Sequence, residues 1–253
     1  MCIMNEYCIK YGLNEERLPR HVAIIMDGSG RWAENRLKNR MGHKAGADAV
    51  DAIMILCREI GIEYLTLYAF STENWNRPEA EVAGLMNVFG ESLKSKKSIL
   101  VEHNIRLNII GEKEKFSPDL IKLMDETIEA TKQKPAKMVL TLALGYGSRQ
   151  EITAAVKKIA EKVAKKEIKP ENIDEKLISG NLYTFDMPDP DLVIRTSGEC
   201  RISNYLLWQI AYSEFYFTGT LWPDFNQEEL VKALKDYAGR ERRFGKTGDQ
   251  VKS

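Results

Sequence analysis

The sequence predicts an α/β fold with an open, mostly parallel sheet of six strands wrapped by helices. Six short apolar runs along the 253 residues are near-continuous instead of alternating, which is typical of strands covered on both faces. Segments with helical spacing of apolar residues separate the runs, and this alternation favours a parallel sheet. Six strands fall short of the eight that a closed α/β barrel needs, so we expect the sheet to be open.

The expected elements can be placed from local signals. The expected strands are residues 21–27, 62–71, 105–111, 138–145, 191–196 and 214–218. The expected helices are residues 43–60, 79–102, 117–133, 148–166 and 226–237. The first helix carries Ala49, Ile53 and Leu56 on one side, which indicates a buried face. In the third, Ser117 followed by Pro118 is a typical N-cap and first-turn pair.

Composition and charge exclude several classes of protein. Lys+Arg and Asp+Glu are both 37, and this balance disfavours a general nucleic-acid-binding surface, so we expect no nucleic-acid partner. No run of 18 apolar residues occurs, so we expect no transmembrane span. Residues 1–10 lack a basic segment and a long apolar stretch, so we expect no signal peptide. The cysteines match no zinc or CxxC spacing, and their scatter suits reduced thiols in the cytoplasm: Cys2, Cys8, Cys57 and Cys200.

The loop after the first strand is the first candidate site, because ligands of open α/β sheets bind beyond the C-terminal strand ends. It reads Asp27-Gly28-Ser29-Gly30-Arg31-Trp32-Ala33. Its glycines let the backbone approach a phosphate, and they also match the G-x-G-x-x-A fingerprint of an NAD-dependent oxidoreductase. Against that alternative, the second strand ends in Ser71 and not in a ribose-binding acid. Asp27 beside a phosphate would need a cation such as Mg²⁺ between them, or it is only a helix cap.

Polar residues also follow the second and fifth strands. The loop after the second strand contains Phe70, Ser71, Asn74, Trp75 and Arg77. The alternative for that loop is an ordinary capped turn into the next helix, because one Arg beside polar groups is not specific. After the fifth strand, Arg195, Arg201 and Ser203 suit an anion clamp, unless the arginines merely pair with Glu199. Glu214 opens the sixth strand, either as a second acid at a metal site or as a solvated strand end.

Two helical features have both a structural and a functional explanation. His43 begins the first long helix, where a neutral imidazole is favoured. The second helix carries an apolar stripe formed by Val82, Leu85, Phe89, Leu93 and Leu100. Such a stripe is most often plain core. Gly84 and Gly90 interrupt this helix at a cost of about 1 kcal/mol each relative to Ala, which hints at room for an apolar ligand.

Six ordered stretches carry a family resemblance. They are HVAIIMDGSGRWA (21–33), GHKAGA (42–47), LTLYAFSTENWNRPEAEV (65–82), DPDLVIRTSGECRISNYLLWQIAYSEFYF (189–217), LWPDF (221–225) and RRFG (242–245). The chain resembles the cis-prenyltransferases, the family of undecaprenyl diphosphate synthase. The resemblance begins at residue 18, so we expect an N-terminal extension (1–17) and a single catalytic domain (18–253).

The resemblance implies a magnesium-dependent, dimeric enzyme that adds isopentenyl diphosphate to an allylic prenyl diphosphate. It assigns Mg²⁺ to Asp27 and Glu214. It assigns the binding of the allylic diphosphate to Gly28, Gly30, Arg31 and His43, and Ser29, Trp32 and Arg40 join the substrate-binding set. It assigns the isopentenyl diphosphate clamp to Arg195, Arg201 and Ser203.

The resemblance also implies a loop that closes over the substrate and residues that reach the site of a partner subunit. The loop that closes over substrate would comprise Phe70, Ser71, Asn74, Trp75 and Arg77, with Ser71, Asn74 and Arg77 joining Asp27 as catalytic residues. Arg243 and Gly245 would reach the partner subunit's site. The apolar stripe would line a tunnel for the growing chain. We expect a cytoplasmic enzyme that contacts a membrane surface transiently through its lipid product.

The sequence departs from the family pattern at three places. Ser29 replaces the usual Asn, and Asn39 replaces an Arg four residues before the His, with Arg40 one place nearer. The stretch usually read as Asn-Tyr-Gly-Gly-Arg is Gly145-Tyr146-Gly147-Ser148-Arg149. We expect these changes at the allylic side, with the isopentenyl clamp intact. An irregular, non-head-to-tail condensation is therefore an alternative, and a non-catalytic subunit is a weaker one, because Asp27 and the arginines are present.

Overall fold

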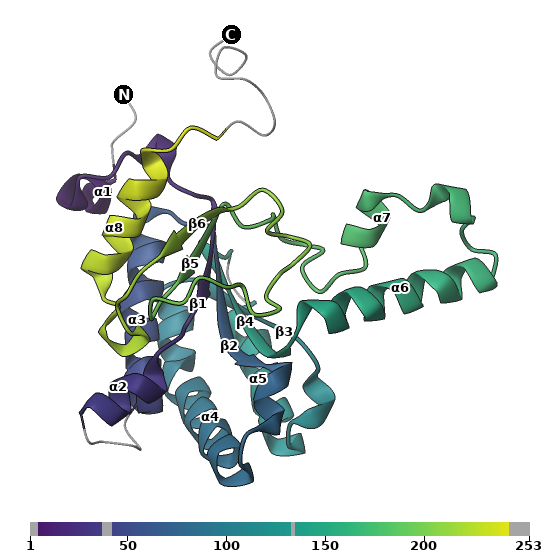
Figure 1. Cartoon of the computed structure of the whole chain (residues 1–253), viewed down its shortest axis with the longest axis horizontal. Coiled ribbons are helices and arrows are strands. Elements are labelled where there is room, and N and C mark those ends of the chain that lie inside the picture. The colour runs from purple at the N-terminus through teal and green to yellow at the C-terminus, as the bar shows by residue number, and fades with distance from the viewer. Residues whose placement is uncertain (1–4, 37–41, 133–134, 243–253) are drawn as a thin grey trace.

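One open parallel sheet organises the protein. The computed structural model describes residues 5–36, 42–132 and 135–242. Over these residues six strands pair in the order β3-β4-β2-β1-β5-β6, and every pairing is parallel (Figure 1). The strands are β1 His21–Ile25, β2 Tyr64–Ser71, β3 Ile105–Ile110, β4 Met138–Tyr146, β5 Leu192–Arg195 and β6 Glu214–Phe217. All six expected strands are confirmed.

The expected helices are confirmed as well. They are α3 Gly42–Ile60, α4 Glu79–Glu102, α5 Pro118–Thr131, α6 Ser148–Ala164 and α8 Gln227–Ala238. The sequence did not predict three short helices, which are α1 Glu6–Tyr11, α2 Ser29–Asn35 and α7 Glu175–Ser179. At five to seven residues, each is too short to show a helical period clearly. No helix in the described ranges has the length and apolarity that a membrane crossing requires.

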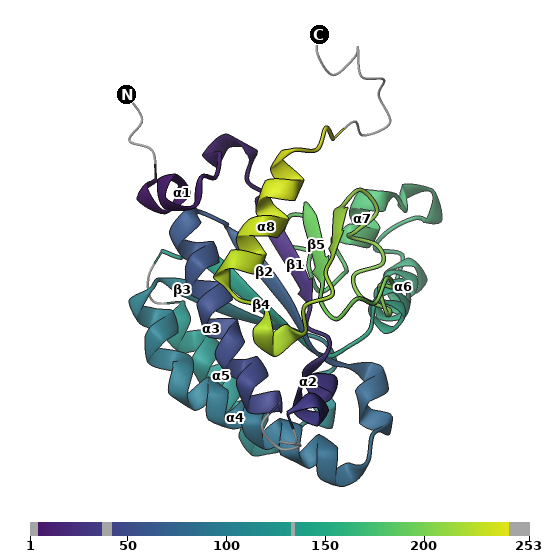
Figure 2. The same cartoon turned by 60° about the vertical axis from the view of Figure 1, so that its left-hand side comes forward.

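The two faces of the sheet are covered differently. Helices α3, α4, α5 and α8 pack on one face and form the larger apolar core with it (Figure 2). The other face is covered by a smaller cluster around Tyr146, Tyr205 and Leu206. Helix α6 extends away from the sheet together with α7 (Figure 1). Burial on both faces explains why the strands read as continuous apolar runs.

The described part of the N-terminal extension packs on the body. Cys8 on α1 is fully buried in the larger core. The Asn5 side chain donates to the Glu59 carbonyl at 2.7 Å and caps α1 by accepting from the Tyr7 N–H at 2.9 Å. Gly12 ends the helix with φ 61°. These contacts fix the extension against α3.

Candidate active site

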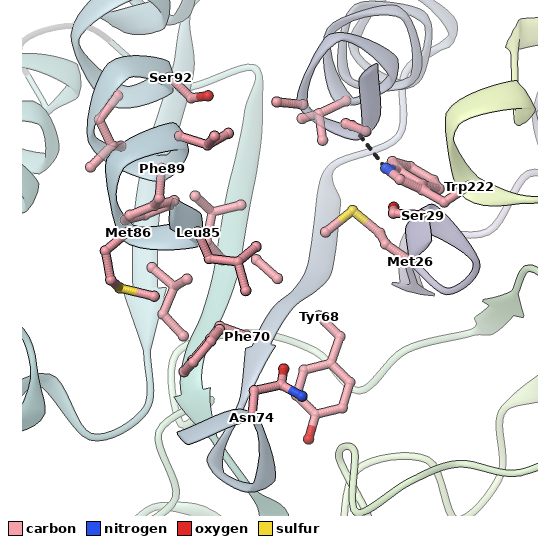
Figure 3. A pocket seen from close by; sticks show the side chains of 18 of the residues that line it. Met26, Ser29, Tyr68, Phe70, Asn74, Leu85, Met86, Phe89, Ser92 and Trp222 are labelled. Atoms are coloured by element: carbon pink, nitrogen blue, oxygen red, sulfur yellow. Dashed lines mark hydrogen bonds between the residues drawn. The ribbon is translucent and has the colours of Figure 1, made fainter. Parts of the chain in front are cut away.

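A cavity of about 480 Å³ opens at the C-terminal edge of the sheet. It lies between the strands and helices α3 and α4, with Leu85 and Phe89 on one wall and Met26 and Trp222 on the other (Figure 3). Strand β1 pairs with β2 on one side and β5 on the other, so the end of the cavity at Asp27 lies beside the point where the strand order reverses, the usual ligand position in such sheets. It has a polar mouth and an apolar interior.

Asp27 lies at the centre of the polar mouth. Its carboxylate accepts a hydrogen bond from Arg195 Nη2 at 2.8 Å. The Thr196 hydroxyl accepts from the Asp27 N–H at 2.9 Å and donates to the Asp27 carbonyl at 2.7 Å. Burial pushes the pKa of Asp27 up, but hydrogen bonds from Arg195 and Ser197 and the charge of Arg195 hold it below its usual range. Asp27 is therefore ionised at neutral pH while it lines the cavity.

The two glycines after Asp27 lack a side chain for different physical reasons. Gly28 has φ 104°, and a Cβ there would come within 2.8 Å of Leu221 Cδ2 and 2.9 Å of Ser197 Cβ. The fold itself requires this glycine. At Gly30 a Cβ would meet no described atom within 4 Å. Gly30 lines the cavity, so the space above it is open to a ligand.

Exposed arginines surround the mouth. Arg31 donates to Ser197 Oγ at 2.7 Å and lies 3.4 Å from Glu199, which also pairs with Arg201. Arg77 pairs with Glu81 at 2.9 Å, one helical turn away. Such exposed pairs are each worth about 0–1 kcal/mol. A diphosphate could displace these carboxylates at little cost, so the surface pairing with Glu199 does not oppose an anion site.

Arg195 lies beneath the mouth. Its side chain is only 4% exposed. Nη1 donates to Ser203 Oγ at 2.8 Å and to the Arg201 carbonyl, and Nε has no hydrogen-bond partner among the described residues. Arg195 therefore orients Asp27 and Ser203, and it is not among the residues that line the cavity.

The loop after β2 is held by its own side chains. Ser71 and Asn74 form a capping box on the short 3₁₀ helix Thr72–Asn76, and Asn74 Oδ1 accepts from the Ser71 N–H at 2.9 Å. Trp75 packs against Phe70 and Phe116, with ring centroids 4.8 Å and 5.1 Å apart. A register shift at Phe70 bends the end of β2. Phe70, Asn74 and Arg77 line the cavity, whereas Ser71 and Trp75 lie behind them.

The cavity interior is mostly apolar. From the predicted stripe, Leu85, Phe89, Leu93 and Leu100 line it, and Val82 does not. The expectation that Gly84 and Gly90 make room for an apolar ligand is wrong. A Cβ at Gly90 would approach only Leu120 on α5, one at Gly84 would meet no described atom within 4 Å, and neither glycine lines the cavity.

Two polar side chains of α4, Ser92 and Lys96, reach the wall of the interior. Lys96 Nζ bonds Asp51 Oδ2 at 2.5 Å and the Ala47 carbonyl at 2.9 Å, which ties α4 to α3. The ammonium group is thereby held against α3, and its apolar stem is left to line the cavity.

The structure does not bring Glu214 to Asp27 within one chain. Glu214 begins β6 and pairs in register with Leu192, three residues before Arg195. That offset corresponds to about 10 Å along the strand, away from the mouth. Glu214 instead bonds Arg240 at 2.8 Å. Within one chain the two predicted metal-site acids are therefore not brought together, because Glu214 starts its strand whereas Asp27 follows one, and the assignment of Glu214 to a metal stays a prediction.

Several other predicted residues lie away from the cavity or outside the described residues. Trp32 is not among the lining residues, and its indole donates to Asp224 Oδ1 at 2.8 Å, which holds α2 in place. Arg40, Arg243 and Gly245 lie outside the described residues, as do Asn39 and the side chain of His43. Conversely, the sequence did not single out Met26, Gly46, Tyr68 or Trp222, which line the cavity. They stand within the stretches that carry the family resemblance, but only the packing of their elements shows that they line the cavity.

The third departure from the family pattern also lies elsewhere than expected. Ser148 Oγ accepts from the Leu207 N–H at 2.9 Å, and the Ser148 N–H donates to the Asn204 carbonyl at 2.8 Å. The segment Gly145–Arg149 therefore supports the loop that carries Ser203, which is the predicted isopentenyl side. Ser29, in contrast, lines the mouth as expected.

An ionic mouth that opens into an apolar cavity suits a molecule with a charged head and a long apolar tail. Residues 25–245 match the family described as "Putative undecaprenyl diphosphate synthase". The chain belongs to this family, which confirms the resemblance. It is an enzyme of the prenyltransferase type, and the alternatives of an oxidoreductase and a non-catalytic subunit fall away.

Three similar proteins illustrate the range of the family. An isoprenyl transferase of Geobacter sulfurreducens is 48% identical over 242 residues, covering 95% of this chain and 98% of that protein. A ditrans,polycis-undecaprenyl-diphosphate synthase of Aliivibrio fischeri, named as (2E,6E)-farnesyl-diphosphate specific, is 47% identical over 95% of this chain and 94% of its own. Lavandulyl diphosphate synthase from Lavandula x intermedia, crystallised with dimethylallyl diphosphate, superposes with a TM-score of 0.89 at 36% identity, covering 91% and 100% of the two chains.

Proposed function

We propose that the protein condenses isopentenyl diphosphate with an allylic prenyl diphosphate, with Mg²⁺, to give a longer cis-linked polyprenyl diphosphate. One observation carries this proposal: the mouth around Asp27, Arg31 and Arg77 is continuous with the apolar cavity along α4. The mouth suits diphosphates, which arginine binds strongly. The interior suits a hydrocarbon that lengthens at its head while its tail moves inward.

The residues present fit a magnesium ion. Mg²⁺ is usually held by one or two carboxylates together with substrate phosphates. Asp27 is half-buried, ionised and lines the cavity, so it supplies one such carboxylate. Bound there, the ion would neutralise charge that develops on a departing diphosphate. Because Glu214 lies at the other end of its own sheet, a second acid from Glu214 would have to come from another copy of the chain.

The reaction breaks the allylic carbon–oxygen bond, and the diphosphate leaves with the electron pair. The double bond of isopentenyl diphosphate attacks the allylic carbon, and a proton is then lost from the adduct. Exposed Arg31, Arg77 and Arg201 would stabilise the two diphosphates, and fixing both heads in one mouth brings the reacting carbons together.

Ser71 acts in this scheme as a positioning group, because its side chain caps the turn to Asn74. We assign the proton that the adduct loses to an oxygen of a diphosphate. Ser71→Ala should therefore lower turnover through a misplaced loop. Full turnover with unchanged substrate binding would contradict this role.

We also propose a homodimer whose contact includes the edge of the sheet at β6, which pairs with no further strand in the part of the chain that the structure describes. Strand β6 ends the strand order, and exposed aromatic side chains lie on or near it, with Phe217 40% and Tyr212 71% exposed. An unpaired edge beside such side chains is a typical interaction surface. A cytoplasmic location, with transient membrane contact through the lipid product, is the remaining part of the proposal. The free, buried thiols of Cys8 and Cys57 suit it.

An irregular condensation of two allylic units is the second candidate. It is favoured by the close superposition on lavandulyl diphosphate synthase, whose crystal structure holds dimethylallyl diphosphate. In that case the second diphosphate subsite would accept an allylic molecule in place of isopentenyl diphosphate.

One radiolabelled assay separates the candidates. Purified protein with Mg²⁺ receives isopentenyl diphosphate and, in turn, dimethylallyl, geranyl, farnesyl or geranylgeranyl diphosphate, and also dimethylallyl diphosphate alone. Products that lengthen with isopentenyl diphosphate and carry cis bonds support chain elongation. Product from dimethylallyl diphosphate alone supports irregular condensation, and absence of isopentenyl incorporation with every primer contradicts the main proposal.

A further inference from the structure

Two loops flank the mouth, and one side chain joins them. The turn Thr72–Asn76 follows β2, and the segment 201–206 follows β5; β1 lies between these two strands in the sheet. Asn204 Nδ2 nevertheless donates to Glu73 Oε1 at 3.0 Å and to Gln150 Oε1 at 3.1 Å. The first of these bonds connects the loop after β5 directly with the loop after β2.

The orientation of Asn204 is fixed from the α6 side. The Arg149 N–H donates to Asn204 Oδ1 at 2.9 Å, and the Ser148 N–H donates to the Asn204 carbonyl at 2.8 Å. Because Oδ1 is already an acceptor there, the NH₂ group must face Glu73 and Gln150. Asn204 also has φ 60°, a conformation that Asn tolerates better than most residues.

The junction is closely packed. A Cβ at Gly147 would lie 2.6 Å from Thr72 Oγ1 and 2.7 Å from Asn204 Nδ2. Gly147, between β4 and α6, therefore lies against both loops at the point where they meet. Because the packing leaves no empty space here, one loop cannot shift without moving the other.

Next to the junction, the loop after β2 carries Asn74, which lines the cavity, and the loop after β5 carries Ser203, which does not line it but is linked to Asp27 through Arg195. Ser203, directly before Asn204, accepts from Arg195, which also holds Asp27. Asn74, directly after Glu73, lines the cavity beside Tyr68 (Figure 3). The Tyr68 hydroxyl donates to the Ser203 carbonyl at 3.3 Å. The bond between Asn204 and Glu73 thus spans the two halves of the mouth.

We propose that Asn204 is a positioning residue that couples the two diphosphate subsites through its hydrogen bond to Glu73. A ligand that fixes the position of the loop after β2 also fixes the loop that carries Ser203. Each ligand therefore raises the affinity for the other. Coupling of this kind is reciprocal and is commonly about 5- to 150-fold in affinity. The inference rests on the proposed function, since it needs two substrates in one mouth.

The variant Asn204→Asp tests the bond with almost no change in shape. It keeps the oxygen that accepts from the Arg149 N–H and the tolerance for positive φ, but it loses both donors. Burial pushes the pKa of Glu73 up, yet hydrogen bonds, including that from Asn204, hold it below its usual range. The new carboxylate would therefore face an ionised Glu73 and repel it.

A second substitution and a control make the test specific. In Asn204→Asp/Glu73→Gln, the amide introduced at position 73 can donate to the new carboxylate, which restores the bond with its direction reversed. Gln150→Ala is the matched control, because it removes the other acceptor of the same amide without touching the loop after β2. Melting temperatures verify that all three variants fold.

The measurement is calorimetric titration of isopentenyl diphosphate with Mg²⁺, in the absence and in the presence of saturating farnesyl thiodiphosphate, an unreactive allylic analogue. We expect the analogue to tighten binding at least about 5-fold in the wild type and in Gln150→Ala. In Asn204→Asp the factor should fall towards one, with each ligand's separate affinity largely retained, and the double variant should recover it. An unchanged factor in Asn204→Asp, or no recovery in the double variant, would overturn the inference.

The failure of the proposed function would look different. If the wild type incorporates isopentenyl diphosphate in the radiolabelled assay but the coupling factor does not respond to Asn204→Asp, only the inference fails. If the wild type incorporates none with any primer, the proposed function fails first, and the coupling it was to support falls with it.

Discussion

Two carboxylate–guanidinium pairs stand at opposite ends of the same sheet. Asp27 and Arg195 meet at 2.8 Å beyond the C-terminal ends of the strands, and Glu214 and Arg240 meet at 2.8 Å where β6 begins. The acids are similarly exposed, at 31% and 29% of their side chains. The arginines differ, because Arg195 is buried at 4% exposure whereas Arg240 is 31% exposed and also bonds Asp236.

The difference between the two pairs is their surroundings. Buried Arg195 is fixed by Ser203 and holds Asp27 against an open cavity. Arg240 joins Glu214 to the end of α8, where the charges neutralise one another. Residue type and pair distance therefore do not define a reactive site. A charge becomes available to a substrate when the fold holds it rigidly beside accessible space.

The largest effect should follow from changing the acid at the mouth. We expect Asp27→Asn to lower turnover about 100- to 1000-fold, the usual cost of removing one preorganised electrostatic group. Stability should change far less. Steady-state kinetics and thermal melting measure both quantities. Asp125→Asn, on an exposed acid of α5 that lies 3.4 Å from Lys113, is the control. Equal turnover in the two variants would remove Asp27 from the mechanism.

His21, at the other end of β1 from Asp27, should affect the stability of the fold and not catalysis. His21 donates from Nδ1 to the Pro188 carbonyl and accepts from Thr66 at Nε2, both at 2.7 Å. Its pKa is lowered to about 4, mainly by burial. Since the unfolded chain takes up the proton near pH 6.5, stability is full above that pH and is lost as pH falls towards 4, by on the order of 3 kcal/mol.

Denaturant unfolding at several pH values measures this effect of His21. In His21→Gln the free energy of unfolding should depend less on pH between 6.5 and 4, even if the variant is less stable at every pH. Identical pH slopes for the wild type and His21→Gln would contradict the assignment.

Two neighbouring glycines at the mouth should separate folding from binding. Gly28→Ala should destabilise the fold by about 1–3 kcal/mol, because its φ is positive and a Cβ would collide with Leu221 and Ser197. Gly30→Ala should leave the melting temperature nearly unchanged but weaken diphosphate binding, because its Cβ would enter ligand space. Calorimetry with an allylic diphosphate and thermal melting test both. The account fails if the two variants exchange these effects.

The smallest effect on stability should come from Glu214→Gln, at less than about 1 kcal/mol for a partly exposed pair. Its effect on turnover should depend on a second copy of the chain. Glu214 lies away from the mouth of its own chain, so it can act only at the mouth of a partner. Co-refolding Asp27→Asn with Glu214→Gln would create mixed dimers with one intact site. Recovered turnover in the mixture supports a shared site, and turnover no greater than that of the separate variants places the action of Glu214 within its own chain.

The sequence predicted the elements well because burial on both faces of a sheet leaves continuous apolar runs. It predicted Asp27 and Arg31 for a similar reason, since both follow a strand in a glycine-containing loop. It placed Glu214 correctly at the start of a strand, but it did not show that this start lies at the opposite edge of the sheet from Asp27. It also misread Gly84 and Gly90, because helical spacing does not tell which side of α4 faces the cavity and which faces α5.

Features that depend on contacts between distant segments were beyond the sequence pattern. Trp222 reaches the cavity wall through a hydrogen bond from its indole to the Gly46 carbonyl at 2.8 Å (Figure 3). Asn204 joins its own loop to the turn after β2 and to the start of α6, three segments that are far apart along the chain. Both residues lie in the stretches that carry the family resemblance, but their contacts cannot be predicted locally, because each partner lies more than 50 positions away.

A crystal structure with Mg²⁺, isopentenyl diphosphate and farnesyl thiodiphosphate tests the central claim most directly. The account predicts two diphosphates in the mouth, one over Gly30 and Arg31, and the farnesyl chain lying along Leu85, Phe89 and Leu93. A farnesyl chain bound outside this cavity, or diphosphates bound away from Asp27, would contradict it.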